Sequence, residues 1–423
     1  MSRTDQVEHT DSISSQDPNR EEPKKTKSRR PPNTAFRQQR LKAWQPILTP
    51  KTVLPLFFIV GVIFAPIGGL LLYASAQVQE ISIDYTNCNT TAPRQDSTNF
   101  DPTAENQLET IPSGRVSSTF KSNADPAAMW GWGRENYTFE SGVSLETNVC
   151  ILSFTIPETI KPPILFYYRL TNFYQNHRRY VKSVDIDQLK GDVRSASDLS
   201  SGDCSPLDND PETGLPYYPC GLIANSMFND TFSNLTLANP AGGSDSASGQ
   251  NYTMTVEGTS WSHEGDLYGK TKYKPEDVVP PPNWQQQYPN GRYNGSLPDL
   301  HTWEQFQVWM RTAGLPTFSK LYQRNDNDEL SAGTYRLKIY DRFPVDKYSG
   351  TKSILISTRT VMGGKNPFLG IAYLVVGGIC ILLGAVFLAT HLIKPRKLGD
   401  HTYLTWNNDQ PSTATTTGRQ GGA

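Results

Sequence analysis

Residues 53–74 read VLPLFFIVGVIFAPIGGLLLYA, and this stretch decides how the rest of the chain can fold. It lies inside a segment of 28 residues, Thr52–Gln79, that carries no charged side chain. A second segment of 28 residues, Asn366–Ile393, also lacks Asp, Glu, Lys and Arg, and only its His391 titrates near neutral pH. About 20 apolar residues span the hydrocarbon core of a bilayer. The sequence therefore predicts a protein that crosses a membrane twice.

The charges that flank these segments predict their orientation. Pro23–Lys51 contains nine basic residues and no acidic one, and Lys394–Lys397 adds three basic residues after the second segment. Because cytoplasmic flanks are rich in Lys and Arg, we expect both termini in the cytoplasm. Ala74–Ala76 (ASA) resembles a signal-peptidase site, and cleavage there would leave a single-span protein. The apolar run, however, is longer than the h-region of about 7–15 residues in a signal peptide.

The distribution of net charge supports the same organisation. The total of −1 combines +5 for residues 1–77, −8 for residues 78–365 and +2 for the remainder. Such segregation is typical of a chain whose parts lie in different compartments. We expect a mostly disordered basic cytoplasmic tail (1–50), a membrane helix (51–77), an outer domain (78–365), a second membrane helix (366–393) and a cytoplasmic tail (394–423).

The outer segment carries the marks of the secretory lumen. It holds four of the five cysteines and all of the Asn-x-Ser/Thr sequons, which are acceptors for N-linked glycans. The six sequons are at Asn89, Asn136, Asn229, Asn234, Asn251 and Asn294. The four cysteines are Cys88, Cys150, Cys204 and Cys220. We therefore expect a glycosylated, disulfide-bonded domain.

The spacing of the cysteines favours one of the three possible pairings. Cys204 and Cys220 are 16 residues apart across a stretch rich in Pro, Asp and Gly, which suggests that they pair locally. Cys88 would then pair with Cys150. A zinc site is not expected, because the chain has no Cys-x-x-Cys and no paired histidines.

The secondary-structure signals in the outer domain favour strands. Apolar and polar residues alternate in Cys150–Ile156, Tyr252–Val256 and Tyr335–Tyr340, as in half-buried strands. Ile164–Leu170 and Ile354–Ser357 are largely apolar, as in strands buried on both faces. Dense turn residues between these runs indicate an antiparallel β-sandwich with long loops. One helix is predicted near Trp303–Met310, with Thr302 as its N-cap and Gln305 completing a capping box.

No catalytic signature is present. Gly265–Thr271 is one residue short of a phosphate-binding loop, and the motifs of serine hydrolases, zinc proteases and dinucleotide-binding folds are absent. The six histidines do not have metal-ligand spacing. We therefore expect no enzyme activity, no cofactor and no metal. A luminal hydrolase with a triad set only by geometry, and a stand-alone glycosylated receptor, are the alternatives.

Two features indicate binding surfaces. The segment Phe173–Tyr180 mixes aromatic and basic residues, which suits a lipid headgroup or a glycan. The interpretation that we favour is a strand end whose Arg side chains stack on Tyr rings and pair with nearby acids. In the membrane segments, Gly61, Ala65 and Gly69 are spaced by four residues, and Gly370, Gly377 and Gly384 by seven. Small residues along one helix face allow helices to approach closely.

Five blocks carry a resemblance to a known family. They are Thr34–Trp44 (TAFRQQRLKAW), Phe173–Tyr180 (FYQNHRRY), Pro219–Ser226 (PCGLIANS), Trp309–Pro316 (WMRTAGLP) and Gly363–Tyr373 (GGKNPFLGIAY). With these blocks in order from about Asn33 to Lys394, the chain resembles a fungal member of the cell-division-control-fifty/LEM-three family.

The resemblance implies a function that the composition alone does not. Members of this family are accessory beta subunits of phospholipid flippases, the type IV P-type ATPases. The implied partner is the ATPase alpha subunit in a heterodimer within the lipid membrane, and nucleic acid has no role. The implied role is to assemble the ATPase, to support its export from the endoplasmic reticulum and to support lipid translocation to the cytoplasmic leaflet. The implied compartments are the endoplasmic reticulum, Golgi or endosome, and plasma membrane.

We expect two groups of residues to contact the partner. One group, in the aromatic and basic block, comprises Phe173, Tyr174, His177, Arg178 and Arg179. The other, in the turn that joins the outer domain to the second membrane segment, comprises Gly363, Gly364, Lys365, Asn366 and Pro367.

Overall fold

The computed structural model describes residues 33–42, 48–95, 107–122, 126–240, 249–359 and 364–395. The chain forms two compact units. One unit comprises the chain up to Leu56 and from Val386 onward, and its described residues are a turn at 35–39, the start of helix α1 and the end of helix α8. The other unit, Phe57–Ala385, contains the remainder of both helices and the whole outer domain.

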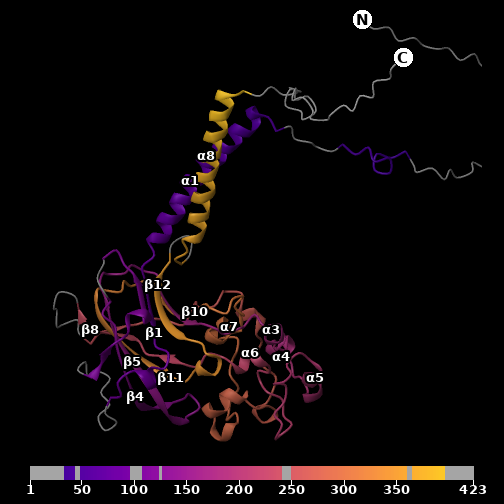
Figure 1. The fold of residues 1–423 in the computed structure, drawn as a ribbon. Coiled ribbons are helices and arrows are strands. Elements are labelled where there is room, and N and C mark those ends of the chain that lie inside the picture. Colours follow the sequence, from indigo (N-terminus) through magenta and orange to yellow (C-terminus); the bar gives the residue numbers. More distant parts are fainter. Residues whose placement is uncertain are drawn as a thin grey trace, which may run out of the picture. The chain divides into compact units, whose positions relative to one another are not determined.

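Two long helices correspond to the two apolar segments. Helix α1 (Pro50–Ala76) has 27 residues and helix α8 (Phe368–Ile393) has 26, and both are long and apolar enough to cross a membrane. Most of their large side chains are exposed, for example Leu70 at 69% and Leu382 at 62%. A water-soluble protein would bury such a surface. Within the larger unit the two helices lie side by side (Figure 1).

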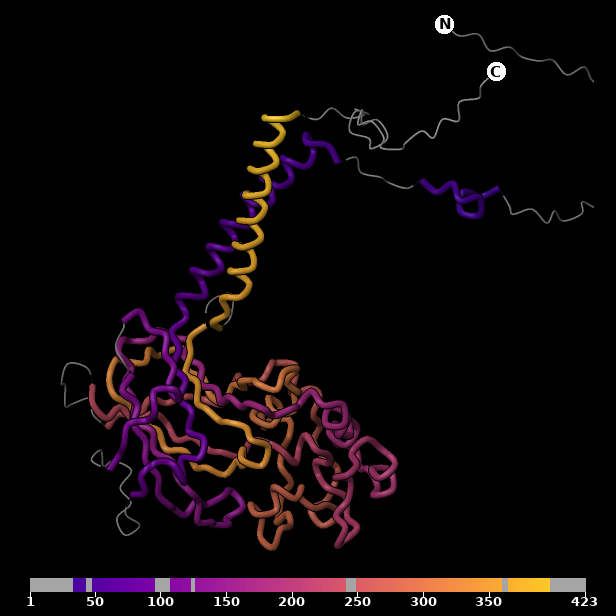
Figure 2. Tube along the Cα trace, viewed as in Figure 1, coloured from indigo at the N-terminus to yellow at the C-terminus, as the bar shows by residue number. Residues whose placement is uncertain are grey.

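In the first β-sheet, the strands that are nearest to the two long helices in the sequence, β1 and β12, pair with each other. The order of this sheet is β10–β6–β12–β1–β3, and every neighbouring pair is antiparallel. Strand β1 follows α1 after three residues, and the chain can be followed from this helix into the sheet in Figure 2. Strand β1 pairs with β12, with Ser82 opposite Leu355. The strands are β1 (Glu80–Asp84), β3 (Val116–Thr119), β6 (Ile164–Leu170), β10 (Phe318–Asn325) and β12 (Lys352–Thr358).

The second sheet has seven antiparallel strands in the order β2–β4–β5–β11–β8–β9, with β7 also paired to β11. Its longest pair of strands is the hairpin β4–β5, in which Trp132 lies opposite Cys150. The strands are β2 (Glu109–Thr110), β4 (Met129–Thr138), β5 (Ser144–Ile156), β7 (Thr231–Phe232), β8 (Leu235–Pro240), β9 (Asn251–Tyr252) and β11 (Gly333–Asp341).

One apolar core joins the two sheets. Ile83 and Phe166 from the first sheet and Leu152 and Leu337 from the second belong to the same buried cluster and are fully or almost fully buried. Inward residues alternate with outward ones in β11, while β12 is buried along nearly its whole length. The predicted fold class, two membrane helices with a mainly-β antiparallel sandwich, is confirmed.

Short helices and long loops form a second part of the outer domain (Figure 1). It has its own apolar cluster, in which Tyr218, Trp284 and Phe306 pack together. A third cluster surrounds the Cys204–Cys220 disulfide. The helices of the outer domain are α2 (Cys88–Thr91), α3 (Arg178–Lys182), α4 (Ile186–Leu189), α5 (Ala196–Ser201), α6 (Leu222–Asn225) and α7 (Glu304–Met310).

Two local predictions were wrong in detail. The capping box does not form, because α7 begins at Glu304 and Thr302 instead donates its hydroxyl to the carbonyl of Asp299. The Glu304 carboxylate is held by the backbone N–H groups of Gly258 and Ser260. The strand predicted at Tyr252–Val256 forms only at its first residue, where Tyr252 ends the two-residue strand β9, and Thr255 makes one isolated bridge to Arg324.

Candidate functional site

The membrane helices contact each other through small residues that recur every seven positions. A Cβ added at Gly61 would lie 2.5 Å from Cγ1 of Ile381. One added at Gly377 would lie 2.9 Å from the backbone nitrogen of Ala65. The backbones therefore approach as closely as glycine permits. The buried small residues are Gly61, Gly68 and Ser75 in α1, and Gly370, Gly377 and Gly384 in α8.

The predicted face of α1 is wrong at one position. Gly69 is exposed, and a Cβ added there would meet no atom within 4 Å, whereas Gly68 is buried against α8. At about 100° per residue, position 68 lies roughly 20° from Gly61 around the helix and position 69 roughly 80°. A seven-residue repeat keeps one seam in contact along two crossing helices. Both helices therefore share the same repeat.

The aromatic and basic block is divided between the core and the surface. Phe173 packs with its ring centroid 5.7 Å from that of Trp309 and 5.2 Å from that of Tyr348. Gln175 is fully buried, and its side chain accepts a hydrogen bond from the backbone of Ala313 and donates to Tyr180. These inward residues hold the segment in place.

The outward residues of the block are Tyr174, His177, Arg178 and Arg179, and all of them are exposed. Arg178 and Arg179 begin helix α3, so the favoured interpretation of this block as a strand end is wrong. Among the described residues neither arginine has an ion pair or a ring stacked under it. Two free guanidinium groups next to an exposed tyrosine are a surface that suits an acidic partner.

The turn before α8 is described from Gly364 onward, and Gly363 lies outside the described residues. Gly364, Lys365, Asn366 and Pro367 are exposed. The Lys365 ammonium donates to Thr119 at 2.6 Å, and the backbone N–H of Asn366 donates to the hydroxyl of Ser75 at 3.1 Å. The turn is therefore fixed to β3 and to the end of α1.

The structure joins Cys88 to Cys150 and Cys204 to Cys220, the pairing that the spacing favoured. The first disulfide attaches α2 to β5, and the second closes the loop after α5. The sequon residues differ in exposure. Asn136, Asn234, Asn251 and Asn294 are exposed, whereas Asn89 and Asn229 are half-buried.

A buried charge cluster that the sequence did not suggest joins the two sheets. The ammonium of Lys352, on β12, lies 2.8 Å from a carboxylate oxygen of Asp230 and also contacts Asp341 at the end of β11. The Tyr85 hydroxyl donates to the same oxygen of Asp230 at 2.9 Å. Burial by itself lowers the pKa of Lys352, but the two carboxylates outweigh burial and raise the pKa above its ordinary value. The cation is therefore retained in the core.

A second buried lysine closes the end of α7. Lys320 is 6% exposed, and its ammonium donates to the carbonyls of Val308, Trp309 and Arg311. These are among the last carbonyls of a helix, which have no partner inside the helix itself. Burial, together with the nearby charge of Arg311, lowers the pKa of Lys320 to about 7.

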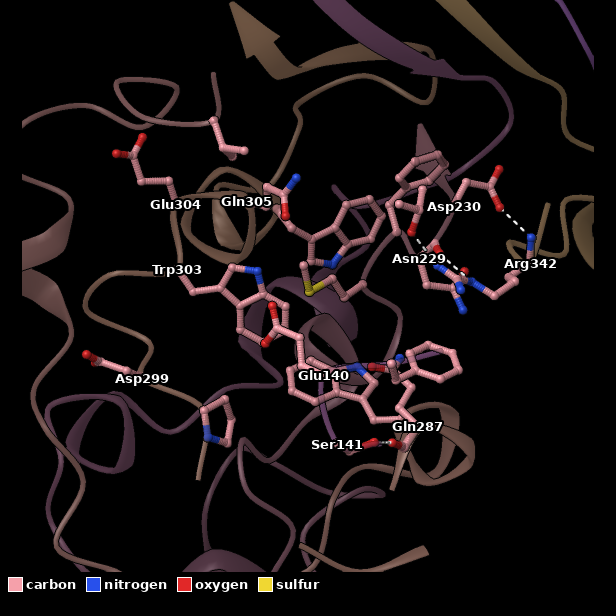
Figure 3. A pocket seen from close by; sticks show the side chains of 18 of the residues that line it. Glu140, Ser141, Asn229, Asp230, Gln287, Asp299, Trp303, Glu304, Gln305 and Arg342 are labelled. Atoms are coloured by element: carbon pink, nitrogen blue, oxygen red, sulfur yellow. Dashed lines mark hydrogen bonds between the residues drawn. The ribbon is translucent and has the colours of Figure 1, made fainter. Parts of the chain in front are cut away.

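A pocket of about 790 Å³ lies beside α7, between the β4–β5 turn and the loops before the helix (Figure 3). Its walls include Trp303 and Tyr322, and its polar groups include Glu140, Asp299 and Glu304. The polar groups come from segments far apart in the sequence. No group of metal-ligating side chains occurs in the described part of the chain.

The comparisons with known proteins agree with this architecture. A model of the LEM3 (ligand-effect modulator 3) family / CDC50 family matches residues 71–397. The chain is 43% identical over 389 residues to the phospholipid-transporting ATPase accessory subunit CDC50 of Chaetomium thermophilum, covering 90% of this chain and 92% of the relative. It is 43% identical over 386 residues to the phospholipid-transporting ATPase accessory subunit CRF1 of Saccharomyces cerevisiae, covering 91% of each. It is 39% identical over 378 residues to cell cycle control protein 50A of Mus musculus, covering 86% of this chain and 89% of the relative.

Proposed function

The chain belongs to the LEM3/CDC50 family, and from this premise we propose that it is the non-catalytic accessory subunit of a phospholipid-transporting P-type ATPase. The observation that carries the proposal is the near full-length match to relatives named as accessory subunits of such ATPases. The partner performs the ATP chemistry and moves the lipid.

The accessory subunit acts by binding some states of its partner more tightly than others. A subunit can shift a transport cycle only by the difference between its affinities for the states of that cycle. We propose that the outer domain grips the luminal loops of the ATPase, and that this grip favours the states open to the lumen. The contact residues are the exposed half of the aromatic and basic block and the turn at 364–367. The same grip supports assembly of the complex and its export from the endoplasmic reticulum.

The proposed topology places both termini in the cytoplasm and the outer domain in the lumen or outside the cell. The basic flanks of the apolar segments support this orientation. The sequons and the two disulfides support a luminal outer domain, because both belong to an oxidising secretory environment. The proposed sites of residence are the endoplasmic reticulum, the Golgi or endosome, and the plasma membrane.

Purification of the tagged full-length chain in mild detergent tests the proposal. We expect a much larger companion in equal amount that becomes labelled by ATP. The chain purified without the companion should neither hydrolyse ATP nor move lipid in liposomes. ATP hydrolysis or lipid movement by the chain alone would contradict the accessory role. A chain that purifies without any companion, yet binds a ligand, would indicate a stand-alone receptor.

A further inference from the structure

The pocket beside α7 has the size and the location of a saccharide site. Its volume of about 790 Å³ falls in the range of about 300–1,000 Å³ that holds compact organic ligands. Two of the six sequon asparagines, Asn229 and Asn294, lie in its lining. The first sugar of a glycan attached at either asparagine would therefore lie at the pocket itself.

Aromatic rings form one wall of the pocket. The rings of Trp284 and Trp303 have centroids 5.4 Å apart, and Trp303 stacks on Phe306 at the start of α7. Tyr288 also lines the pocket, and both Trp303 and Tyr288 are partly exposed to it. The C–H faces of a pyranose ring are apolar and pack on such rings, which combine a large apolar face with little side-chain freedom.

Hydrogen-bond acceptors surround this wall. Figure 3 shows Glu140 and Asp299 around the pocket, together with the amides of Gln287 and Gln305. The carboxylate of Glu304 is already held by the backbone N–H groups of Gly258 and Ser260 and is not counted among the free acceptors. Carboxylates and amide oxygens accept hydrogen bonds from sugar hydroxyl and acetamido N–H groups. A phosphate-bearing ligand is disfavoured, because it would meet these negative charges. The guanidinium of Arg342 donates to the carbonyl of Asn229 and to Thr231, and its Nη1 has no hydrogen-bond partner in the described part of the chain.

Asn294 is the better placed of the two asparagines. Its side chain is exposed, and it stands between buried Tyr293 and Gly295, whose φ of +84° turns the chain there. The Tyr293 hydroxyl donates to the carbonyl of Tyr218, which fixes the chain immediately before the sequon. Asn229 is half-buried with its amide oxygen inside the wall, so a sugar on Asn229 would disturb that wall.

We propose that the pocket holds the first N-acetylglucosamine residues of an N-linked glycan carried by Asn294. The bound sugar contacts the β4–β5 turn, the 282–287 segment and the start of α7, which all contribute to the lining of the pocket. The inference rests on the proposed luminal location of the outer domain, since only luminal sequons receive glycans.

Native-state removal of glycans from the purified full-length chain tests the inference. Endoglycosidase is added without denaturant, and mass spectrometry of glycopeptides follows each sequon separately. We expect the Asn294 glycan to be released at least about tenfold more slowly than the glycan on exposed Asn136, the factor that about 1.4 kcal/mol of retention gives. Trp303→Ala should remove most of this difference, while denatured protein should release both glycans equally.

A binding measurement provides a second test that does not depend on glycan release. In the Asn294→Gln protein the pocket is free, and added N,N′-diacetylchitobiose should change the tryptophan fluorescence in a saturable way. Asn136→Gln, which leaves the pocket filled, is the matched control and should not respond.

The possible outcomes distinguish the assignment of the pocket to the Asn294 glycan from the proposed luminal location of the outer domain. Release at Asn294 as fast as at Asn136, or protection of the Asn229 glycan instead, would overturn the assignment of the pocket to the Asn294 glycan. So would a glycan at the other sequons with Asn294 unmodified. A protein without glycans at any sequon would instead contradict the luminal location, and with it the proposed function.

Discussion

Gly68 of α1 faces Leu374 of α8 so closely that a Cβ added to Gly68 would lie 2.7 Å from the backbone nitrogen of Leu374. No real Cβ tolerates such a contact with backbone, so one of the helices would have to move. A Cβ added to the neighbouring Gly69, which points to a different side of α1, would meet no atom within 4 Å. Of these two adjacent glycines, Gly68 therefore has no room for a side chain, whereas Gly69 has.

The first prediction compares these two glycines. Gly68→Leu should force α1 and α8 apart and lower the thermal stability of the purified chain in detergent, because the close seam is lost. Gly69→Leu should leave the stability of the isolated chain nearly unchanged. Equal loss in both variants would contradict the seam described here. A defect of Gly69→Leu that appears only in the complex would place the ATPase on the exposed face of α1.

The second prediction concerns the buried charge cluster. Lys352→Met leaves the carboxylates of Asp230 and Asp341 buried without their cation, and removal of one member of a buried ion pair typically costs about 3–5 kcal/mol. Chemical unfolding of the outer domain in the full-length chain measures this cost. Lys338→Met is the control, because the Lys338–Glu135 pair is partly exposed and such pairs contribute about 0–1 kcal/mol. Equal losses in the two variants would refute the assigned role of the cluster.

The third prediction is a pH dependence from Lys320. The unfolded chain keeps this proton up to about pH 10.5, whereas the folded chain releases it near pH 7. Between these values the unfolded state binds more protons, so Lys320 makes the free energy of unfolding rise with pH. Below about pH 7 the full cost of burying the cation is present.

Unfolding experiments at pH 7 and pH 9 measure this contribution. The stability of the parent protein relative to Lys320→Met should increase by about 2 kcal/mol over that interval, since one pKa unit corresponds to about 1.4 kcal/mol. The same comparison with Lys338→Met should show no such increase, because the pKa of Lys338 is raised by its hydrogen bond to Glu135, which outweighs burial. A difference between parent and Lys320→Met that does not change with pH would show that Lys320 stays charged throughout.

The fourth prediction tests the exposed half of the aromatic and basic block. Arg178→Ala combined with Arg179→Ala should change the stability of the isolated chain by less than about 0.5 kcal/mol, because both side chains are on the surface. In the complex, the same change should lower lipid-stimulated ATPase activity or export from the endoplasmic reticulum. Gln175→Leu is the contrasting variant, since it should destabilise the chain itself by removing buried hydrogen bonds. Full activity of the double arginine variant would exclude this surface as a partner contact.

Features that depend on local sequence patterns were predictable. The two apolar segments, the alternation in β11 and the apolar run of β6 each lie within a few consecutive residues. Strand β5 was also predicted, but as half-buried, whereas residues 149–154 are buried on both faces of the sheet. These local patterns were sufficient for the fold class. The resemblance to the family, carried by five blocks, was also sufficient for the biological role, and the family match confirms it.

Features that depend on distant partners were not predictable. Lys352 begins a strand and looks like a surface residue in the sequence, but Asp230 reaches it from 122 residues away. The choice between Gly68 and Gly69 depends on the angle at which two helices cross, which no single helix encodes. Thr302 had the right spacing for a cap, yet the tertiary hydrogen bonds of Glu304 decided where α7 begins. The pocket, likewise, is assembled from separate loops.

The strand order has a consequence for how this protein is made. Strand β12 lies between β6 and β1 in the first sheet, and β11 lies between β5 and β8 in the second. Both central strands are synthesised after all of the other strands, so the ribosome delivers an outer domain with a gap in each sheet until its last residues emerge. Until then the unpaired edges of β1, β6 and β5 are exposed to chaperones and to aggregation. Completion of the sandwich therefore coincides with synthesis of the second membrane helix. In a chain truncated before residue 358, the strand edges that β12 would cover stay exposed.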